Sequence, residues 1–310
     1  MTFLAAYTSE EMRSIFVMQG FAGLSLFSVL LLMALGLAII FGQMGVVNLA
    51  HGEFMALGAY MVYLCSELAH NNFPALTPYY FLISIVVAFS VAAIVGAFIE
   101  WSMIRFLYKR PLDTLLATWG LSLIMQQAFR SIFGAREVTP TLPEWLMGSF
   151  KPTETIDIPI NGVFVMALSL VLTAGVAIFI FRSRTGLHMR ATVQNRAMSS
   201  AVGINTSLVD RFTFAMGCGI AGVAGAAFTT IGSTGPDSGS RYIVDTFLVV
   251  VFGGAGSIFG TIVSSFGIAQ GQSISEFFLE GTMGKVVTLM GIVLILMLRP
   301  QGLFPSKVRS

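Results

Sequence analysis

Three polar side chains stand close together in an otherwise apolar stretch, GQMGVVNLAHGEFMALGAY at residues 42–60. They are Asn48, His51 and Glu53. An imidazole and a carboxylate together can transfer protons, and an ionisable group inside a lipid bilayer is costly and usually functional. The stretch therefore allows three interpretations: a catalytic pair, the lining of a solute path, or a buried polar cluster.

Helical phase separates these side chains. Residues three or four apart share a helix face, so Asn48 and His51 lie together, whereas Glu53 points roughly opposite to His51. The HGE spacing also differs from the H-E-x-x-H zinc motif. We therefore predict no catalytic residue, no metal site and a protein that is not an enzyme. Asn48 and His51 are candidates for the lining of a solute path, and Glu53 is expected to hold structure.

The composition indicates a membrane protein. Of the 310 residues, 55% are hydrophobic and only 10% are charged, with a mean hydropathy of +0.84. Soluble domains carry about 25% charged residues. The sequence predicts an all-α polytopic membrane protein that forms one domain over residues 1–310. A spanning helix needs about 20 mostly apolar residues, and about eight such segments are expected. They are 17–41, 45–66, 79–104, 114–133, 162–181, 208–231, 284–298 and an interrupted region at 242–272.

Glycines interrupt two of these segments in the same pattern. F-G-x-x-G occurs at Phe41–Gly45 and again at Phe252–Gly256. Glycine-interrupted segments at matching places in two halves of a chain point to a transport site. The region 242–272 is therefore expected to be re-entrant or to cross twice through short helices. The predicted hinge residues are Gly42, Gly45, Gly253, Gly254 and Gly256.

The basic residues predict the orientation, because Lys and Arg collect in cytoplasmic loops. Most of the 17 Lys and Arg residues fall in two loops and the C-terminal tail, which we assign to the cytoplasm together with the C-terminus. The N-terminus is then outside. These basic residues are Arg105, Lys109, Arg110, Arg182, Arg184, Arg190, Arg196, Arg211, Arg299, Lys307 and Arg309.

One stretch is too polar to span a membrane, TGLHMRATVQNRAMSSAVGI at 185–204. We expect a single amphipathic helix, with Thr185 as the N-cap and Gly203 as the C-terminal stop. It either lies on anionic lipid or docks a cytoplasmic partner. The outer loop 134–161 is either a linker or a second docking surface.

No nucleotide-binding loop is found. The nearest match, EGTMGKVVT at 280–288, lacks the first glycine and the final Ser/Thr of G-x-x-x-x-G-K-[ST]. If ATP drives transport, another polypeptide hydrolyses it. The scarcity of acidic residues inside the apolar segments favours a pore-like subunit driven from outside the membrane, or a passive channel.

Several separated motifs resemble a known family. MGVVNLAHGEFMALGAY, RATVQNRAMSSAVGI, FLVVVFGGAGSIFGTIV and the closing RPQGLFPSK are similar to the membrane subunits of branched-chain amino-acid and amide-type ABC importers. Within that family, the stretches at 115–138 and 143–150 look most like the urea-importer branch. NLAHGE departs mildly from that branch, and GSTGPDSGSRY at 232–242 departs more strongly.

The resemblance implies an inner-membrane permease of a bacterium that pairs with a homologous second permease subunit. Two cytoplasmic ATPases, which would bind ATP and Mg²⁺, and an extracytoplasmic solute-binding protein would complete the importer. This chain itself would bind no cofactor and no nucleic acid. The stretch 185–204 becomes the coupling helix, with Arg190, Gln194, Asn195 and Arg196 as its candidate residues.

The expected solute is a small neutral amide, with urea as the main candidate. Thr118 and Gln126 join Asn48 and His51 as candidate path residues, since a neutral amide needs hydrogen-bond donors and acceptors without net charge. A branched-chain amino-acid permease is the alternative, and a passive urea-type channel is a third hypothesis.

Overall fold

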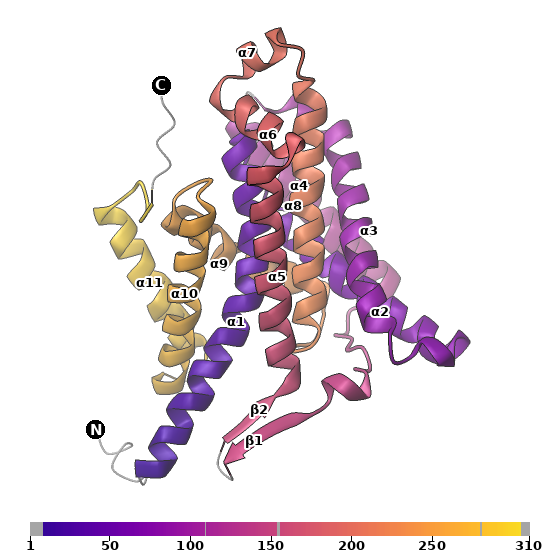
Figure 1. Cartoon of the computed structure of the whole chain (residues 1–310), viewed down its shortest axis with the longest axis vertical. Helices are drawn as coiled ribbons and strands as arrows, with labels where there is room; N and C mark the ends of the chain where they lie inside the picture. Colours follow the sequence, from indigo (N-terminus) through magenta and orange to yellow (C-terminus); the bar gives the residue numbers. More distant parts are fainter. Residues whose placement is uncertain (1–8, 109, 154–155, 280, 305–310) are drawn as a thin grey trace.

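The computed structural model describes residues 9–108, 110–153, 156–279 and 281–304 (Figure 1). Lys109, Lys307 and Arg309, which the charge pattern assigns to the cytoplasmic side, lie outside these residues. The longer helices are α1 (Ser9–Met44), α2 (His51–Asn72), α3 (Tyr80–Ser102), α4 (Pro111–Phe133), α5 (Ile160–Arg182), α6 (Arg184–Gln194), α7 (Arg196–Ala201), α8 (Thr206–Phe228), α9 (Ser238–Gly253), α10 (Ile258–Phe278) and α11 (Thr282–Leu298). Three short 3₁₀ helices, η2 (Pro74–Leu76), η3 (Ile104–Phe106) and η4 (Glu144–Leu146), and two strands, β1 (Ser149–Thr153) and β2 (Ile156–Pro159), complete the described elements.

The helices follow the apolar segments, but the predicted number of spans is not confirmed. Within the described residues, 4 helices are long and apolar enough to cross a membrane: Met12–Met44, Tyr80–Phe106, Ile160–Arg182 and Thr206–Phe228. The helix predicted at 45–66 begins only at His51, and residues 45–50 form a non-helical link between α1 and α2. The region 242–272 divides into α9 and α10, separated by residues 254–257.

Helix α8 lies at the centre of the bundle and packs against α1, α2 and α3. Its glycines allow this close approach, since small residues let helix backbones meet in a membrane. A Cβ added at Gly58 of α2 would lie 2.0 Å from the carbonyl oxygen of Gly222, and one at Gly225 would lie 1.9 Å from that of Met55. The core is therefore built on backbone contact between α2 and α8.

The two ends of the bundle carry different structures. Helices α6 and α7 lie at the upper end in Figure 1, and β1 and β2 lie at the lower end, beside the start of α1. The strands pair antiparallel, with Ser149 opposite Pro159 and Phe150 opposite Ile158. This hairpin is an exception to the all-α prediction. It forms in the loop 134–161, where the proline-rich sequence favours extended backbone over helix.

The stretch at 185–204 is not the single helix that its sequence predicts. Helix α6 ends at Gln194, and α7 begins after Asn195, whose extended backbone (φ −156°) separates the two. Ser183, not Thr185, is the N-cap of α6, because its hydroxyl accepts a hydrogen bond from the Gly186 N–H. Gly203 has φ +89°, as expected for a residue that follows a helix end.

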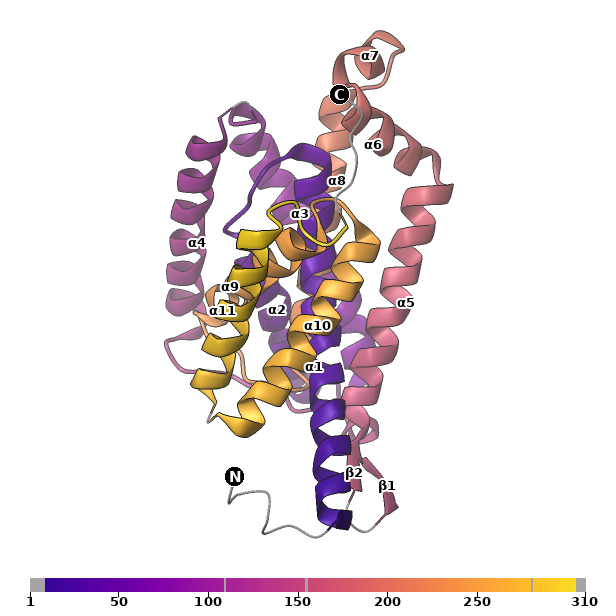
Figure 2. The same cartoon turned by 90° about the vertical axis from the view of Figure 1, so that its left-hand side faces the viewer.

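Helix α4 stands at the edge of the bundle. In Figure 2 it lies on the opposite side from α5, with other helices of the bundle between them. Much of its surface is exposed and apolar, through Leu112, Leu116, Trp119, Leu123, Ile124 and Ile132. A helix of this kind suits contact with lipid or with another apolar protein surface on its outer side.

Candidate transport site

The side chains at the start of α2 face different neighbours. His51 is fully buried, and its Nε2–H donates to the carbonyl oxygen of Met33 on α1, 3.1 Å away. Asn48 is also buried, and its Oδ1 accepts from the N–H of Ala50 at 3.0 Å. This amide caps a local turn, since short polar side chains commonly bond to backbone nearby. His51 and Glu53 therefore do not meet.

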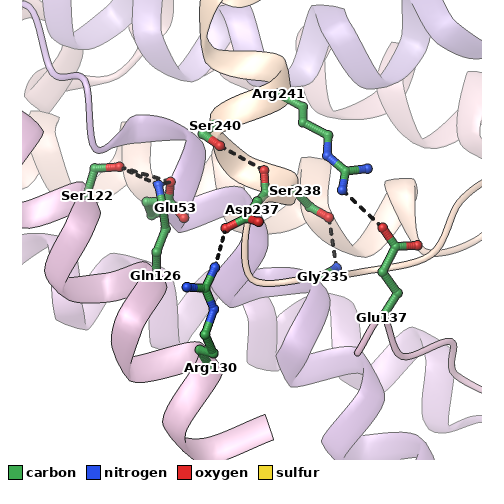
Figure 3. A network of polar contacts seen from close by, with 10 residues as sticks. All are labelled: Glu53, Ser122, Gln126, Arg130, Glu137, Gly235, Asp237, Ser238, Ser240 and Arg241. Carbon is green, nitrogen blue, oxygen red and sulfur yellow. Dashed lines mark hydrogen bonds and ion pairs between the residues drawn. The ribbon is translucent and has the colours of Figure 1, made fainter. Parts of the chain in front are cut away.

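Glu53 faces α4 and belongs to a polar cluster with two of its residues (Figure 3). Its Oε1 accepts from the Ser122 hydroxyl at 3.0 Å and from the Gln126 Nε2 at 2.8 Å. Gln126 also donates to Ser122 at 3.1 Å. Glu53 is 1% exposed. A carboxylate buried this deeply is retained only where such hydrogen bonds or a function compensate its desolvation.

These partners belong to a polar stripe on α4. Its members are spaced four residues apart, so each lies beside the next while the stripe winds gradually around the helix. Between α1 and α2, at residues 45–50, the helix is interrupted. At this first break, the Leu49 N–H donates to the Thr118 hydroxyl at 3.2 Å. The stripe consists of Thr114, Thr118, Ser122, Gln126 and Arg130. Its middle members, Thr118, Ser122 and Gln126, face the start of α2 and the residues just before it.

Ion pairs lie next to the outer part of this cluster (Figure 3). Arg130 bonds Asp237 at 3.0 Å, with 45% and 50% of the two side chains exposed. Arg241 bonds Glu137 at 3.2 Å. The Ser233 hydroxyl, which donates to Glu137, holds the pKa of that carboxyl below its ordinary value, and Arg241 adds to this effect. Exposure falls from these pairs to Glu53, so the cluster leads from the surface into the bundle.

The two F-G-x-x-G patterns meet in space. Gly42 is helical, and a Cβ added there would lie 2.4 Å from the Cα of Gly256. The last glycine of each pattern has a positive φ, +65° at Gly45 and +78° at Gly256. Gly254 adds φ +98°, and Gly253 is the last residue of α9. Positive φ is a conformation that glycine adopts without strain. Gly45 directly follows the end of α1, whereas Gly254, and not Gly256, directly follows the end of α9, so a glycine ends each helix at a different position of the pattern.

The second break, residues 254–257, is held by its own Ser257 and by residues near the C-terminus. The Ser257 hydroxyl accepts from the Gly260 N–H and caps α10. The N–H groups of Leu303 and Phe304 donate to the carbonyl oxygens of Phe252 and Gly253, at 2.8 and 3.2 Å. The carbonyls at the end of α9 would otherwise lack partners. We call residues 299–304 the C-terminal clasp.

The predicted coupling residues divide into two groups. Arg190 lies over the Phe181 ring and donates to the Phe181 carbonyl oxygen at 3.4 Å, which ties α6 to the end of α5. Asn195 caps α7 by accepting from the Met198 N–H. Arg196 pairs with the buried Asp210 of α8 at 2.5 Å. Gln194 is exposed.

A cavity of about 520 Å³ brings predicted hinge and coupling residues together. Gly42 and Gly256 line it from the two breaks, and Arg190 and Gln194 line it from α6. The remaining wall is mostly apolar and comes from α1, α5 and α10. A movement of α6 would therefore act directly on the contact between the breaks.

A second connection joins α7 to the bundle. Arg211 of α8 bonds Glu100 of α3 at 3.1 Å, and the Tyr108 hydroxyl also donates to Glu100. Arg196 lies over the Tyr108 ring, 5.5 Å from its centroid. Burial, together with the bond to Glu100, raises the pKa of Tyr108 well above its ordinary value. Tyr108 therefore stays neutral and keeps donating to Glu100.

Of the four candidate path residues, the structure brings Thr118 and Gln126 onto one face and places His51 and Asn48 elsewhere. Sequence reasoning missed Ser122 and Arg130, although the four-residue spacing along 114–130 is visible in the sequence. In the part of the chain that the structure describes, no group of three or more His, Cys, Asp or Glu side chains could hold a metal ion.

Comparison with known proteins decides the family. The model of the branched-chain amino acid transport system / permease component family matches residues 20–298. The chain belongs to this family. Its members are transport subunits, not enzymes. No solved structure was found to match the chain.

Relatives match along nearly the whole chain. The high-affinity branched-chain amino acid transport system permease protein LivH of Salmonella typhimurium is 28% identical over 297 residues, covering 93% of this chain and 95% of LivH. The corresponding protein BraD of Pseudomonas aeruginosa is 27% identical, covering 91% and 93%. A probable branched-chain amino acid transport permease protein LivH of Methanocaldococcus jannaschii is 26% identical, covering 89% and 88%. None of these three names mentions urea.

Proposed function

We propose that this chain is the single-domain transmembrane subunit of an ATP-driven importer, which moves a small solute inward across a bacterial inner membrane. The observation that carries the proposal is the family match over residues 20–298. ATP and Mg²⁺ bind to separate ATPase subunits, and this chain binds no cofactor. A solute-binding protein and a second, homologous permease subunit complete the importer.

The proposed solute is a branched-chain amino acid, because the similar relatives are named for that transport. Urea is the second candidate. It is favoured by the resemblance of residues 115–138 and 143–150 to the urea-importer branch, and by the uncharged polar side chains of Thr118, Ser122 and Gln126 on α4. Both solutes carry N–H donors, which a buried carboxylate can accept.

The proposed orientation places α6 and α7 in the cytoplasm and the hairpin of β1 and β2 outside. The described arginines of the basic loops belong to the segments around α6 and α7, the link between α3 and α4, and the end of α11. Cytoplasmic loops carry such an excess of basic residues. This places the start of α1 outside and the end of α11 inside.

Helices α6 and α7 form the proposed docking surface for an ATPase. Leu187, Met198 and Val202 are large, apolar and 56–70% exposed. Such side chains at the polar end of a membrane protein suit a protein groove better than water. Arg190 and Arg196 point back to the bundle, so they pass on the movement of the docked helices to α5 and α8.

The function is tested by reconstitution. The chain is assembled with its partner permease subunit, the ATPases and the binding protein in liposomes, and uptake of labelled leucine and labelled urea is measured with and without ATP. We expect ATP-dependent uptake of one of them. Rapid flux of solute through the chain alone, without the ATPases, would instead show a passive channel.

The docking surface is tested by matched substitutions. Met198→Glu should reduce co-purification of the ATPase, because it places a charge in an apolar contact. Met147→Glu is the control, since Met147 is also 61% exposed but directly precedes β1, which lies at the opposite end in Figure 1. Equal ATPase binding in the two variants would contradict the proposed role. Replacing Arg196 is a poorer test, because it also leaves the buried Asp210 unpaired.

A further inference from the structure

The buried carboxyl group of Glu53 has one oxygen that the surrounding protein does not satisfy. Its Oε1 accepts two hydrogen bonds, from Ser122 and Gln126. Its Oε2 is buried and has no hydrogen-bond partner. Leaving a buried polar atom unpaired costs about 1–3 kcal/mol, and more when the group is charged. A chain that keeps such an atom in its core gains something else from it.

A second unpaired group lies on the same side of α2. The hydroxyl of Tyr60 is buried and has no partner, and its ring stacks on Phe133 with 4.1 Å between centroids. Tyr60 follows Glu53 by seven residues, two helical turns along the same face. This face of α2 therefore presents the Glu53 carboxylate and the Tyr60 hydroxyl toward α4. Contacts with α4 hold both side chains in place.

The unpaired oxygen lies close to the outer ion pairs. Asp237 and Arg130 are about half exposed, and Arg130 follows Gln126 by one turn of α4. In Figure 3 the Arg130–Asp237 pair lies next to Gln126 and Glu53. A solute that enters from the outer face and passes this pair would reach Glu53 next.

His51 has a different setting. Its Nδ1 is also unpaired, but the ring is packed against α1, where a Cβ added at Gly36 would lie 3.2 Å from it. Its other nitrogen is held by the Met33 carbonyl. The imidazole is therefore part of the contact between α1 and α2, and Glu53 faces the polar stripe of α4.

We propose that Glu53 is the residue that recognises the solute during its passage. Its Oε2 accepts a hydrogen bond from an N–H group of the solute, while Ser122 and Gln126 fix the other oxygen. The ammonium group of an amino acid and the amide of urea both supply this donor. An anionic solute or one without N–H groups is disfavoured. The inference rests on the proposed transport function and identifies the recognising atom within it.

The test uses the complete importer in liposomes, supplied with saturating amounts of its loaded binding protein. Solute moved per ATP hydrolysed is measured for the wild type and for Glu53→Gln, per assembled complex, with labelled leucine and labelled urea as separate arms. Loss of a hydrogen bond to a charged group corresponds to about a tenfold or larger effect. We expect the solute-to-ATP ratio to fall by that factor in Glu53→Gln. The KM for the loaded binding protein should stay unchanged, because Glu53 is 1% exposed and cannot touch a protein docked on the surface.

Glu67→Gln is the matched control, since Glu67 lies on the same helix but is exposed. It should keep the wild-type ratio. Glu53→Asp keeps a carboxylate and should transport better than Glu53→Gln. If Glu53→Gln does not assemble, Ser122→Ala leaves Glu53 in place, removes one of the groups that hold it, and should lower the ratio by about threefold.

A wild-type ratio in Glu53→Gln, or in Ser122→Ala where the former does not assemble, would overturn the inference while leaving the transport function intact. Transport of neither solute by the wild-type importer would reject the proposed function itself. Wild-type transport of leucine would show that the recognised N–H belongs to an ammonium group. Wild-type transport of urea would show that it belongs to an amide.

Discussion

The two glycine breaks begin alike and are completed differently. Both contain glycines of an F-G-x-x-G pattern, and in both a glycine with positive φ directly follows the helix, Gly45 after α1 and Gly254 after α9. After Gly45, the chain is held by the Asn48 side chain and by the Thr118 hydroxyl of α4. After Gly256, it is held by the Ser257 cap and, at the end of α9, by the backbone of the C-terminal clasp.

This difference separates two tasks. The first break leads directly to Glu53 and the polar stripe of α4, so its surroundings offer side-chain donors and acceptors. The second break is fastened by backbone hydrogen bonds, and it lines the cavity beside α6 together with Gly42 and Gln43 of α1. We infer that the first break contributes to solute recognition and the second to mechanical coupling, with the contact of Gly42 and Gly256 joining them.

The largest effect is expected where the breaks touch. Gly42→Ala places a Cβ 2.4 Å from the Cα of Gly256, so backbone has to move, at a cost of about 3 kcal/mol in stability. Transport should be lost, and the thermal unfolding temperature of the purified importer should fall. Gly20→Ala is the control on the same helix, because nothing lies within 4 Å of its added Cβ. Equal unfolding temperatures for the two variants would mean that the contact is not required.

A smaller effect is expected at the C-terminal clasp. In Gly302→Ala, the new Cβ would lie 2.6 Å from the Val251 carbonyl oxygen, at φ +76°. Lifting the clasp away loses two hydrogen bonds, at about 1 kcal/mol each. We expect slower transport and faster proteolysis near the C-terminus. Gly281→Ala is the control, because Gly281 also has a positive φ but its added Cβ would meet nothing within 4 Å. Any transport lost in Gly302→Ala beyond that lost in Gly281→Ala therefore reports the contribution of the clasp.

At the first break, Thr118→Val should remove the partner of the Leu49 N–H and cost about 1–2 kcal/mol. Thr118→Ser keeps the hydroxyl and should restore both stability and uptake. Denaturation of the purified chain and uptake by the importer provide the two measurements. If Thr118→Val and Thr118→Ser are equally stable and take up solute equally fast, the hydroxyl does not stabilise the first break.

The smallest effect is expected at the cap of the second break. Ser257→Ala removes the acceptor for the Gly260 N–H and should cost about 1 kcal/mol, with transport reduced only modestly. Asn205→Ala is a comparable change, because Asn205 caps α8 by accepting from Leu208, away from both breaks. A larger transport defect in Ser257→Ala, at similar loss of stability, would show that this break participates in coupling.

The sequence anticipated the positions of helices and breaks more closely than the neighbours of individual side chains. Apolar segments at 79–104, 162–181 and 208–231 became α3, α5 and α8 within a few residues. The stretch at 185–204 was predicted as one helix and forms two. Asn195 interrupts it, because its side chain competes for a backbone N–H at the start of α7.

The candidate site was only partly predictable. Helical phase separated His51 from Glu53 correctly, since His51 bonds α1 and Glu53 bonds α4. Phase gives directions relative to one helix axis and does not identify which helix lies there. The roles of Asn48, His51, Thr118 and Gln126 in transport stay predictions.

The sequence alone determined that this chain is a membrane protein, that glycines interrupt its helices at two places, and which end of the bundle is basic. These properties follow from local composition and from the freedom of glycine to adopt positive φ. The tertiary structure decided that Glu53 meets Ser122 and Gln126, that Gly42 touches Gly256, and that residues 299–304 close the end of α9. Each of these contacts joins residues far apart in the chain, so it depends on how the helices pack and not on local pattern.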